Sequence, residues 1–182
     1  MNFIETKLKG AYIIELEPLE DKRGFFARSF CRKEFQEHGL NPCVVQCNIS
    51  FNKKKGTLRG LHYQIAPHEE AKLMRSISGA IYDVIIDLRS DSLTYCQWFA
   101  MELNAKSYNM LYVPEGFAHG FQTLEDNTVV FYQASESYNP EYEKGIRWND
   151  PAFAIKWPEA DQRIISDKDQ SHPDFVKDKD TR

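Results

Sequence analysis

The strongest constraint on the fold is a series of short apolar runs that recur along most of the chain, separated by turn residues. Runs of this length and spacing are typical of strands in an antiparallel sandwich or barrel. Long helical segments do not alternate with them, which argues against a doubly wound parallel sheet. The expected strands cover residues 11–18, 43–51, 57–65, 70–77, 80–88, 96–103, 109–113, 116–124 and 128–135.

Only residues 31–40 have a helical pattern, with Gly39 as the expected C-terminal stop. No repeat, low-complexity block or linker divides the sequence, so residues 1–182 are expected to form one domain. The tail, residues 166–182, is rich in charge, and its last ten or so residues are expected to fray. The tail begins directly after the apolar pair Ile164–Ile165, so its first residues can pack on the domain.

The charge and the apolar runs exclude several classes of protein. A net charge of −4 argues against a general nucleic-acid binder, which needs a basic face. No apolar stretch is long enough for a transmembrane helix, and the start of the chain lacks the apolar core of a secretory signal. The four cysteines show no C-x-x-C spacing, which predicts buried, reduced thiols in a cytoplasmic protein: Cys31, Cys43, Cys47 and Cys96.

Two polar residues, Arg59 and His62, interrupt the expected strand TLRGLHYQI at 57–65. Strict alternation would place them on opposite faces, but Gly60 between them can form a bulge that turns both toward one cavity. The alternative is an edge strand with a solvated arginine and a hydrogen-bonded histidine. The residues of this strand alone favour that alternative.

The next expected strand supplies Lys72, which shares a face with Met74 and Ser76. If this strand pairs antiparallel with 57–65, Lys72 and His62 can enter the same interior. An ammonium beside an imidazole suits the binding of an anion, such as a phosphate or an enolate. The alternative, an exposed lysine that protects a sheet edge, is about equally consistent with the pattern.

Two further polar side chains lie in expected strands. His119, in VPEGFAHGF at 113–121, falls on an otherwise apolar face and by itself is best explained as a hydrogen-bonded core residue. Tyr132 shares a face with Val130 and Ala134, so its hydroxyl can point inward. For a tyrosine in a strand, a structural role is the default interpretation.

The P-x-G-x-x-H pattern at 114–119 resembles the second motif of the cupin superfamily, whose metal-binding members also carry H-x-H and a glutamate. Here the first motif reads HYQ, with Gln64 in place of the second histidine, and Glu69 or Glu70 as the possible carboxylate. That set is a poor one for zinc or iron. A histidine, a lysine and a tyrosine around one cavity are better suited to moving protons beside a carbonyl group.

Read together, these residues resemble the dTDP-4-dehydrorhamnose 3,5-epimerase family of nucleotide-sugar enzymes. The resemblance covers most of the chain, and its motifs occur in the family's order. They include DKRGFFARSF (21–30), QCNIS (46–50), GTLRGLHYQ (56–64), EAKLMR (70–75), GAIYDVIIDLR (79–89), VPEGFAHGF (113–121), FYQASESYNPEYEKGIRWNDP (131–151), IKWP (155–158) and SDKD (166–169).

The resemblance implies an all-β, cupin-type jelly roll with one or two short helices, working as a homodimer with no metal and no cofactor. The implied reaction converts dTDP-4-dehydro-6-deoxy-D-glucose to dTDP-4-dehydro-L-rhamnose. His62 would be the base that removes protons α to the 4-keto group, and Asp169 would fix its tautomer. Lys72 would neutralise the enolate oxygen, and Tyr132 would return a proton at C5.

The resemblance also implies a set of substrate contacts. The diphosphate and sugar would be held by Arg23, Arg59 and His119, with further contacts from Gln46, Asn48, Glu143 and Lys168. Tyr138 would stack on the nucleotide base, near Phe26. The sequence departs from the family pattern at Arg28, where a glutamate often contacts the nucleotide, and at Gln133, where a lysine is expected.

These departures keep alternatives open. One alternative is a CDP- or another NDP-sugar as the substrate. Another is inversion of C3 alone or of C5 alone. Two other classes remain, a non-catalytic sugar-nucleotide-binding cupin and a metal-dependent cupin. The first is disfavoured because binding alone requires neither Tyr132 nor Asp169.

Overall fold

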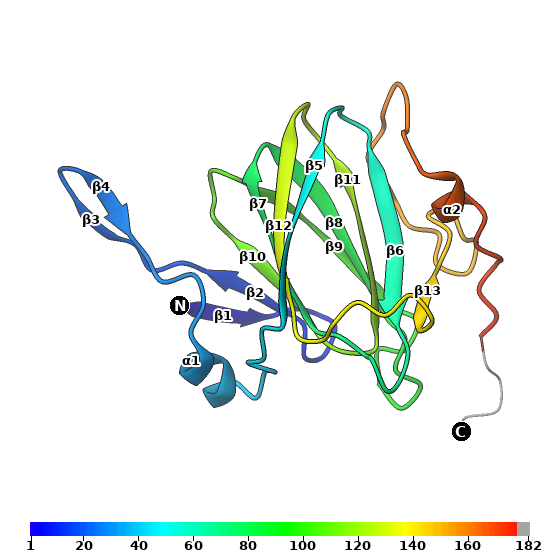
Figure 1. The fold of residues 1–182 in the computed structure, drawn as a ribbon, viewed down its shortest axis with the longest axis horizontal. Coiled ribbons are helices and arrows are strands. Elements are labelled where there is room, and N and C mark those ends of the chain that lie inside the picture. Colours follow the sequence, from blue (N-terminus) through cyan, green and yellow to red (C-terminus); the bar gives the residue numbers. More distant parts are fainter. Residues whose placement is uncertain (178–182) are drawn as a thin grey trace.

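Two antiparallel sheets face each other in the computed structural model, which describes residues 1–177 (Figure 1). The larger sheet has six strands in the order β1 (Asn2–Glu5), β2 (Tyr12–Glu15), β10 (Met110–Val113), β7 (Lys72–Ser78), β12 (Thr128–Ala134) and β5 (Gln46–Asn52). The smaller has five, in the order β13 (Glu143–Gly145), β6 (Leu58–Gln64), β11 (Phe117–Thr123), β8 (Ala80–Asp87) and β9 (Trp98–Asn104). The expected all-β jelly roll is confirmed.

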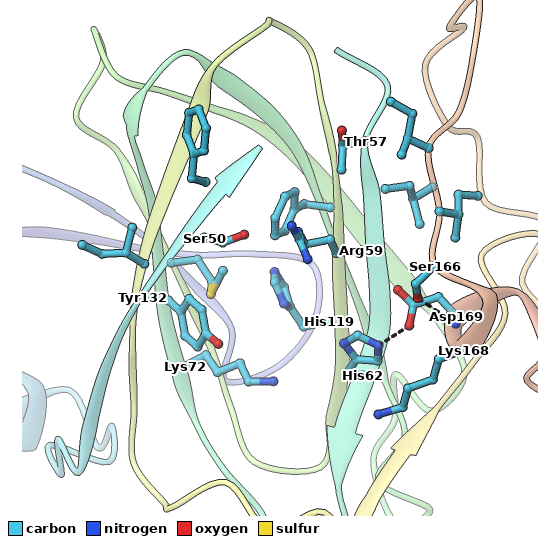
Figure 2. Close-up of a pocket in the computed structure, with 17 residues that line it drawn as sticks. Ser50, Thr57, Arg59, His62, Lys72, His119, Tyr132, Ser166, Lys168 and Asp169 are labelled. Atoms are coloured by element: carbon cyan, nitrogen blue, oxygen red, sulfur yellow. Dashed lines mark hydrogen bonds and ion pairs between the residues drawn. The ribbon is translucent and has the colours of Figure 1, made fainter. Parts of the chain in front are cut away.

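The core lies between the sheets because alternate residues of their strands point inward. Met74 and Val130 from the larger sheet meet Ile81, Ile85 and Phe121 from the smaller one, and all of these side chains are buried. Burying a side chain of this size contributes about 1.5–3 kcal/mol relative to leaving it exposed. At the end of the sandwich near β5 and β6, polar side chains replace this packing and a cavity opens (Figure 2).

The smaller sheet is also covered on its outer face. Val84 and Ile86 of β8 pack there with Ile146 and Phe153, and Trp157 and Phe175 extend the same cluster. Because both faces are covered, β8 is apolar and buried along almost its whole length. The segment after β13 therefore belongs to the same hydrophobic unit as the sandwich.

Two short helices flank the sheets. The expected helix is confirmed as α1 (Arg32–Glu37), which buries Phe35 and ends before Gly39, a residue in the left-handed region with φ +70°. The second, α2 (Asp167–Gln170), lies beside β6 (Figure 1). The start of the tail thus packs on the domain. Fraying is expected for about the last ten residues; among these, Phe175 packs against Phe153, and residues 178–182 lie outside the described residues.

A two-stranded hairpin, β3 (Leu19–Asp21) and β4 (Gly24–Phe26), projects away from the sandwich (Figure 1). All six residues of these two strands are exposed, including the large apolar side chains of Leu19 and Phe26. The two sheets of the sandwich therefore do not cover this hairpin.

The cysteines are free thiols, as predicted, but the prediction that they are buried is wrong. Cys43 and Cys47 are exposed, and Cys31 and Cys96 are partly buried. Cys47 lies on β5, an edge strand, where alternate side chains face away from the sandwich. No helix within residues 1–177 has the length and apolar character needed to cross a membrane.

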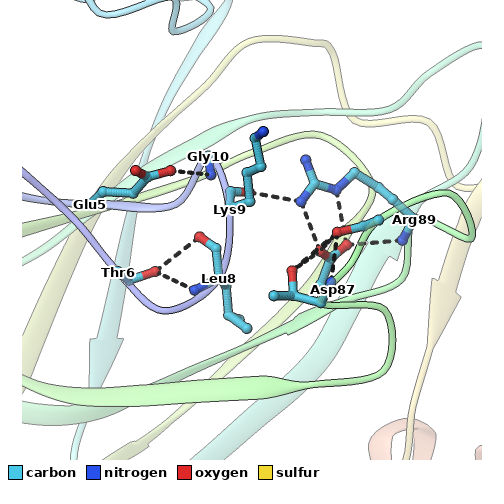
Figure 3. Close-up of polar contacts among 9 residues, drawn as sticks. Glu5, Thr6, Leu8, Lys9, Gly10, Asp87 and Arg89 are labelled. Carbon is cyan, nitrogen blue, oxygen red and sulfur yellow. Dashed lines mark hydrogen bonds and ion pairs between the residues drawn. The ribbon is translucent and has the colours of Figure 1, made fainter.

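A buried carboxylate ties the turn between β1 and β2 to the end of β8 (Figure 3). Asp87 is fully buried and accepts two side-chain hydrogen bonds from Arg89, at 2.9 and 2.7 Å, while Arg89 also donates to the carbonyl of Lys9 at 2.7 Å. Ser92 and Thr94 donate to the same carboxylate. Burial raises the pKa of Asp87, but the hydrogen bonds outweigh burial and leave the pKa below its usual value.

We expect Asp87→Ala to lower the free energy of unfolding by about 3 kcal/mol, because it leaves the half-buried Arg89 charge unpaired. The folded-state pKa of Asp87 lies below its unfolded value, so this stabilisation is present above the unfolded pKa. It is lost as the pH falls through the folded pKa. Urea unfolding at pH 7 and below about pH 4 measures both effects, and a variant within experimental error of the wild type at pH 7 would contradict them.

Candidate active site

A cavity of about 770 Å³ lies between the two sheets and is closed on one side by the segment that enters α2 (Figure 2). Its polar wall gathers side chains from strands far apart in the sequence, and its apolar wall includes Met74, Phe121 and exposed residues of β5. Among the lining residues are Ile49, Phe51, Arg59, His62, Lys72, Met74, His119, Phe121, Tyr132, Ser166, Lys168 and Asp169.

A bulge in β6 brings Arg59 and His62 to this cavity. His119 of β11 pairs with His62, and Phe121 pairs with Arg59, so one residue of β11, Gly120, lies opposite two residues of β6. Gly60 has φ +100°, and a Cβ atom there would lie 2.7 Å from the carbonyl oxygen of His119. Only glycine fits this conformation and this close approach. The bulge considered from the sequence is therefore present, and the edge-strand alternative is wrong because β6 lies between β13 and β11.

Lys72 reaches the cavity from the opposite wall. The expectation that its strand pairs with 57–65 is wrong, because β6 belongs to the smaller sheet and β7 pairs with β10 and β12 in the larger one. The connection between β6 and β7 crosses from one sheet to the other. As a result, Lys72 faces His62 across the cavity instead of lying beside it on a neighbouring strand (Figure 2).

His62 forms a hydrogen-bonded pair with Asp169 of α2, with 2.7 Å between Nε2 and Oδ1. Asp169 is buried and also accepts from the backbone N–H of Gly60, and its own N–H donates to Ser166, the N-cap of α2. Burial raises the pKa of Asp169, but the bonds from His62 and Gly60 outweigh burial and lower it overall. An ionised carboxylate can only accept, so Nε2 of His62 carries the proton and Nδ1 keeps its lone pair. The second ring nitrogen lies on the cavity side (Figure 2).

Tyr132 and Lys72 lie close together on the other wall, from the neighbouring strands β12 and β7. The Lys72 ammonium is 2.8 Å from Glu70, and both side chains are almost buried. Burial raises the pKa of Tyr132, the charge of Glu70 raises it further, and Arg59 opposes the change. The phenol therefore keeps its proton at neutral pH and can act as a proton donor.

His119 forms a second histidine–carboxylate pair, with 2.6 Å between its Nε2 and Oδ1 of Asp83. Both residues are buried, which confirms the hydrogen-bonded core interpretation, and His119 also lines the cavity. The metal-binding set considered from the sequence is not assembled within residues 1–177, since His62, His119 and the glutamates do not cluster. Gln64 instead donates to the carbonyls of His68 and Ser137.

A second pocket of about 340 Å³ continues from the cavity and shares His62, Lys72 and Tyr132 with it. Tyr138 donates to Glu143 at 2.8 Å, and Lys168 forms an ion pair with the same carboxylate. The structure therefore brings most of the predicted site residues to one continuous space: Gln46, Asn48, Arg59, His62, Lys72, His119, Tyr132, Tyr138, Glu143, Lys168 and Asp169.

Three predicted binding residues lie elsewhere. Arg23 sits in the turn of the projecting hairpin with its side chain 84% exposed and paired with Asp21. Phe26 is 73% exposed on the same hairpin, and Arg28 pairs with Glu34 at 2.7 Å. None of the three lines the cavity of its own chain. Their binding role remains a prediction.

Sequence reasoning missed two partners of the predicted residues. Glu70, which pairs with Lys72, precedes it by two positions and so falls on the same face of an extended segment. Asp83, which pairs with His119, is a carboxylate inside the apolar run AIYDVIIDL. A buried acid in such a run needs a partner, so this signal was present in the sequence.

Comparison with known proteins agrees with this geometry. The family model described as dTDP-4-dehydrorhamnose 3,5-epimerase matches residues 5–177. A curated relative of that name from Methanothermobacter thermautotrophicus is 46% identical over 93% of this chain and 91% of its own. The structure of the enzyme from Bacillus anthracis, with TDP and PPi bound, has a TM-score of 0.91 at 42% identity, covering 96% of this chain and 99% of that one.

A further similar structure is an epimerase from Legionella pneumophila in complex with dTDP-4-keto-L-rhamnose. Its TM-score is 0.86 at 38% identity, covering 92% of this chain and 89% of that one. The family model spans nearly the whole chain, and the relative matches along nearly the full length of both sequences. The chain therefore belongs to the dTDP-4-dehydrorhamnose 3,5-epimerase family.

Proposed function

We propose that this isomerase inverts C3 and C5 of dTDP-4-dehydro-6-deoxy-D-glucose to give dTDP-4-dehydro-L-rhamnose, by proton transfer that uses only the chain's own side chains. The observation that carries the proposal is the placement of a histidine–carboxylate pair opposite a lysine and a tyrosine around one cavity. The complex of the Legionella relative with dTDP-4-keto-L-rhamnose supports the same class of substrate.

Inversion at a carbon requires that a proton leave one face and that another arrive on the opposite face. His62 belongs to the smaller sheet, whereas Lys72 and Tyr132 belong to the larger one. A sugar ring lying between the sheets would present one face to the imidazole and the other to the phenol. The two-walled cavity is thus suited to inversion, and not only to proton exchange.

In this proposal Nδ1 of His62 removes the proton α to the 4-keto group. The negative charge of Asp169 stabilises the imidazolium that forms, and its hydrogen bond holds the reactive tautomer. As the C–H bond breaks, charge develops on the 4-keto oxygen, where the Lys72 ammonium would stabilise it. Tyr132 then delivers its proton to C5 from the opposite wall and is reprotonated from solvent. Water on that same wall would supply the proton to C3, and the imidazolium releases its proton to solvent between the two steps.

Glu70 tunes this arrangement in the absence of substrate. Its ion pair with Lys72 offsets the cost of holding an ammonium in a nearly buried place. When charge develops on the substrate oxygen, Lys72 has a second anion to stabilise. The charge of Glu70 also helps to keep Tyr132 protonated until it is needed.

The nucleotide part would occupy the second pocket and the exposed rim around it. Arg59 has a free end for a phosphate, because its Nε atom donates to Asn52 while the rest of the guanidinium lines the cavity. His119, Gln46, Asn48, Glu143 and Lys168 would make further polar contacts. The half-exposed ring of Tyr138 is available for stacking on a base.

The departures from the family pattern fall outside the cavity of this chain. Gln133 follows Tyr132 on β12 and so points to the other face of the sheet, away from the cavity. Arg28 is paired with Glu34. Measurements in solution therefore decide whether the substrate carries another nucleotide and whether only one carbon is inverted.

The deciding experiment is incubation with dTDP-4-dehydro-6-deoxyglucose in deuterated water, followed by NMR. We expect deuterium at both C3 and C5, because each carbon is α to the 4-keto group and is inverted through an enolate. Label at one carbon only would identify a single-site epimerase. No label with dTDP-, CDP- or GDP-linked substrates would refute the enzyme class.

We further propose that the chain works as a homodimer in which each hairpin completes the cavity of the other copy. Arg23 and Phe26 lie on a hairpin that projects from the sandwich and is covered by neither sheet (Figure 1). In this conformation they can contact substrate only in another molecule. The β5 edge at the cavity offers Ile49 and Phe51, both largely exposed, as an apolar docking surface.

Mixing two impaired variants tests this arrangement. We expect Arg23→Ala and His62→Ala dimers each to have little activity. After unfolding and refolding together, half of the dimers would be mixed and each would hold one intact site, restoring about a quarter of wild-type activity. If each chain used its own Arg23, every site would remain damaged and no activity would return.

A further inference from the structure

A second imidazole lies beside the proposed base, and it lines neither the cavity nor the second pocket. Gly145 of β13 pairs with His62 of β6, and paired residues of two strands direct their side chains to the same face. Gly145 has no side chain, and the ring of His172 fills that place instead. A Cβ atom at position 145 would lie 2.0 Å from Nε2 of His172. The glycine is therefore required for space.

His172, His62 and Asp169 form a compact donor set. One donor atom from each lies within 4.8 Å of the others, and the two imidazole rings meet edge to face with centroids 6.4 Å apart. Nε2 of His172 is buried and has no hydrogen-bond partner among residues 1–177. A buried ring nitrogen without a partner is costly, and a bound cation would satisfy it.

We propose that His62, Asp169 and His172 bind a divalent transition metal of the zinc class, and that this metal inhibits the enzyme. Two imidazoles and one carboxylate are a donor set that zinc accepts readily. Tetrahedral donors stand about 3.4 Å apart when the bonds are about 2.1 Å long. His62 and Asp169 are 2.7 Å apart at Nε2 and Oδ1, so they would separate slightly as the metal replaces the proton between them, and His172, whose donor atom lies within 4.8 Å, would shift inward.

The surrounding charges permit such a cation. Glu143 lies near His62 and adds a second negative charge, which Lys168 partly neutralises through its ion pair. Arg147 lies close, since it donates to the backbone carbonyl of His172, but its charge is neutralised by an ion pair with Asp174.

Inhibition follows from the tautomer of His62. In the metal-free protein Nε2 carries the proton and Nδ1 offers a lone pair to the cavity. A metal bound at Nε2 needs that lone pair, so the proton of the neutral ring must move to Nδ1. The nitrogen that faces the substrate can then no longer accept a proton, although the sugar cavity itself stays open.

Binding is tested with Co²⁺, whose visible absorption reports bound imidazole, and with Zn²⁺ as a competitor. We expect His172→Ala to weaken Co²⁺ binding by at least about tenfold, the lower end of what loss of supporting groups costs metal sites. Gly145→Ala keeps every ligand but displaces the His172 ring, and it should weaken binding as well. His38→Ala removes an exposed histidine at the end of α1 and serves as the matched control.

Deuterium exchange then tests inhibition, with each variant compared with its own metal-free rate. Zn²⁺ should slow exchange in the wild type and in His38→Ala. In His172→Ala, the same inhibition should require a Zn²⁺ concentration at least about tenfold higher. Equal Co²⁺ affinity in the wild type, His172→Ala and Gly145→Ala would overturn the site. Only the inhibition rests on the proposed role of His62. Co²⁺ binding without inhibition would therefore count against that role and leave the metal site standing.

Discussion

Replacing His62 with alanine should slow deuterium exchange at both C3 and C5 by about 10³-fold or more, within the range that a positioned base supplies. The imidazole presents a free ring nitrogen to the cavity, opposite Lys72 and Tyr132, and a buried carboxylate holds it in place. No water held in its place would have that orientation or that proton affinity. The rate of isotope exchange with saturating substrate measures the loss.

Nucleotide binding should change little in this variant, because Arg59, Tyr138 and Lys168 do not depend on the imidazole for their positions. Isothermal titration with dTDP therefore separates a catalytic defect from a folding defect. His38→Ala provides the control for loss of an imidazole at the surface. If His62→Ala kept turnover near that of the wild type, the base would have to be assigned to another residue.

The fold could be predicted largely from the sequence because its strands are short and amphipathic, and this pattern has few solutions. The expected helix and most expected strands are present, with ends shifted by a few residues. The missed elements include β1, β13 and the β3–β4 hairpin, which are too short to show an amphipathic pattern of their own. β13 has only three residues and exists because it pairs with β6, and the β3–β4 hairpin has no buried face at all.

The site could be predicted in part for the same reason. Gly60 signalled the bulge that turns Arg59 and His62 together, which is a local property of one strand. The position of Lys72 was a matter of topology. A short connection suggested pairing with the preceding strand, but this connection passes to the opposite sheet. Hydrophobic alternation specifies which side chains point inward, and it does not specify which sheet a strand joins.

His172 illustrates what neither periodicity nor motif could indicate. It lies in an irregular segment after α2, and its position depends on Gly145, 27 residues earlier in the chain. This contact has no signature in the sequence, because a glycine in a short strand has many possible causes. That the His172 ring occupies the space left by the missing side chain of Gly145 is visible only in the three-dimensional structure.

Removing the Tyr132 hydroxyl should separate the two inversions. In Tyr132→Phe, His62 and Lys72 still form the enolate, but the proton donor on the opposite wall is lost. We expect inversion at C5 to slow by about 10²–10⁴-fold, while inversion at C3 continues. Deuterium can still enter C5 from the imidazolium, on the face from which the proton left. Configuration at C5 is therefore the decisive readout, together with isotope content.

Tyr82→Phe is the matched control, because Tyr82 is also a partly buried strand tyrosine but packs near Trp157 on the outer face of the smaller sheet. Burial raises the pKa of both phenols, so the two variants differ mainly in whether the hydroxyl faces the cavity. We expect Tyr82→Phe to keep both inversions. Equal loss at C3 and C5 in Tyr132→Phe would mean that the phenol acts on the shared enolate and not as the C5 acid. That result would move the proton donor for C5 to another side chain of the same wall or to solvent.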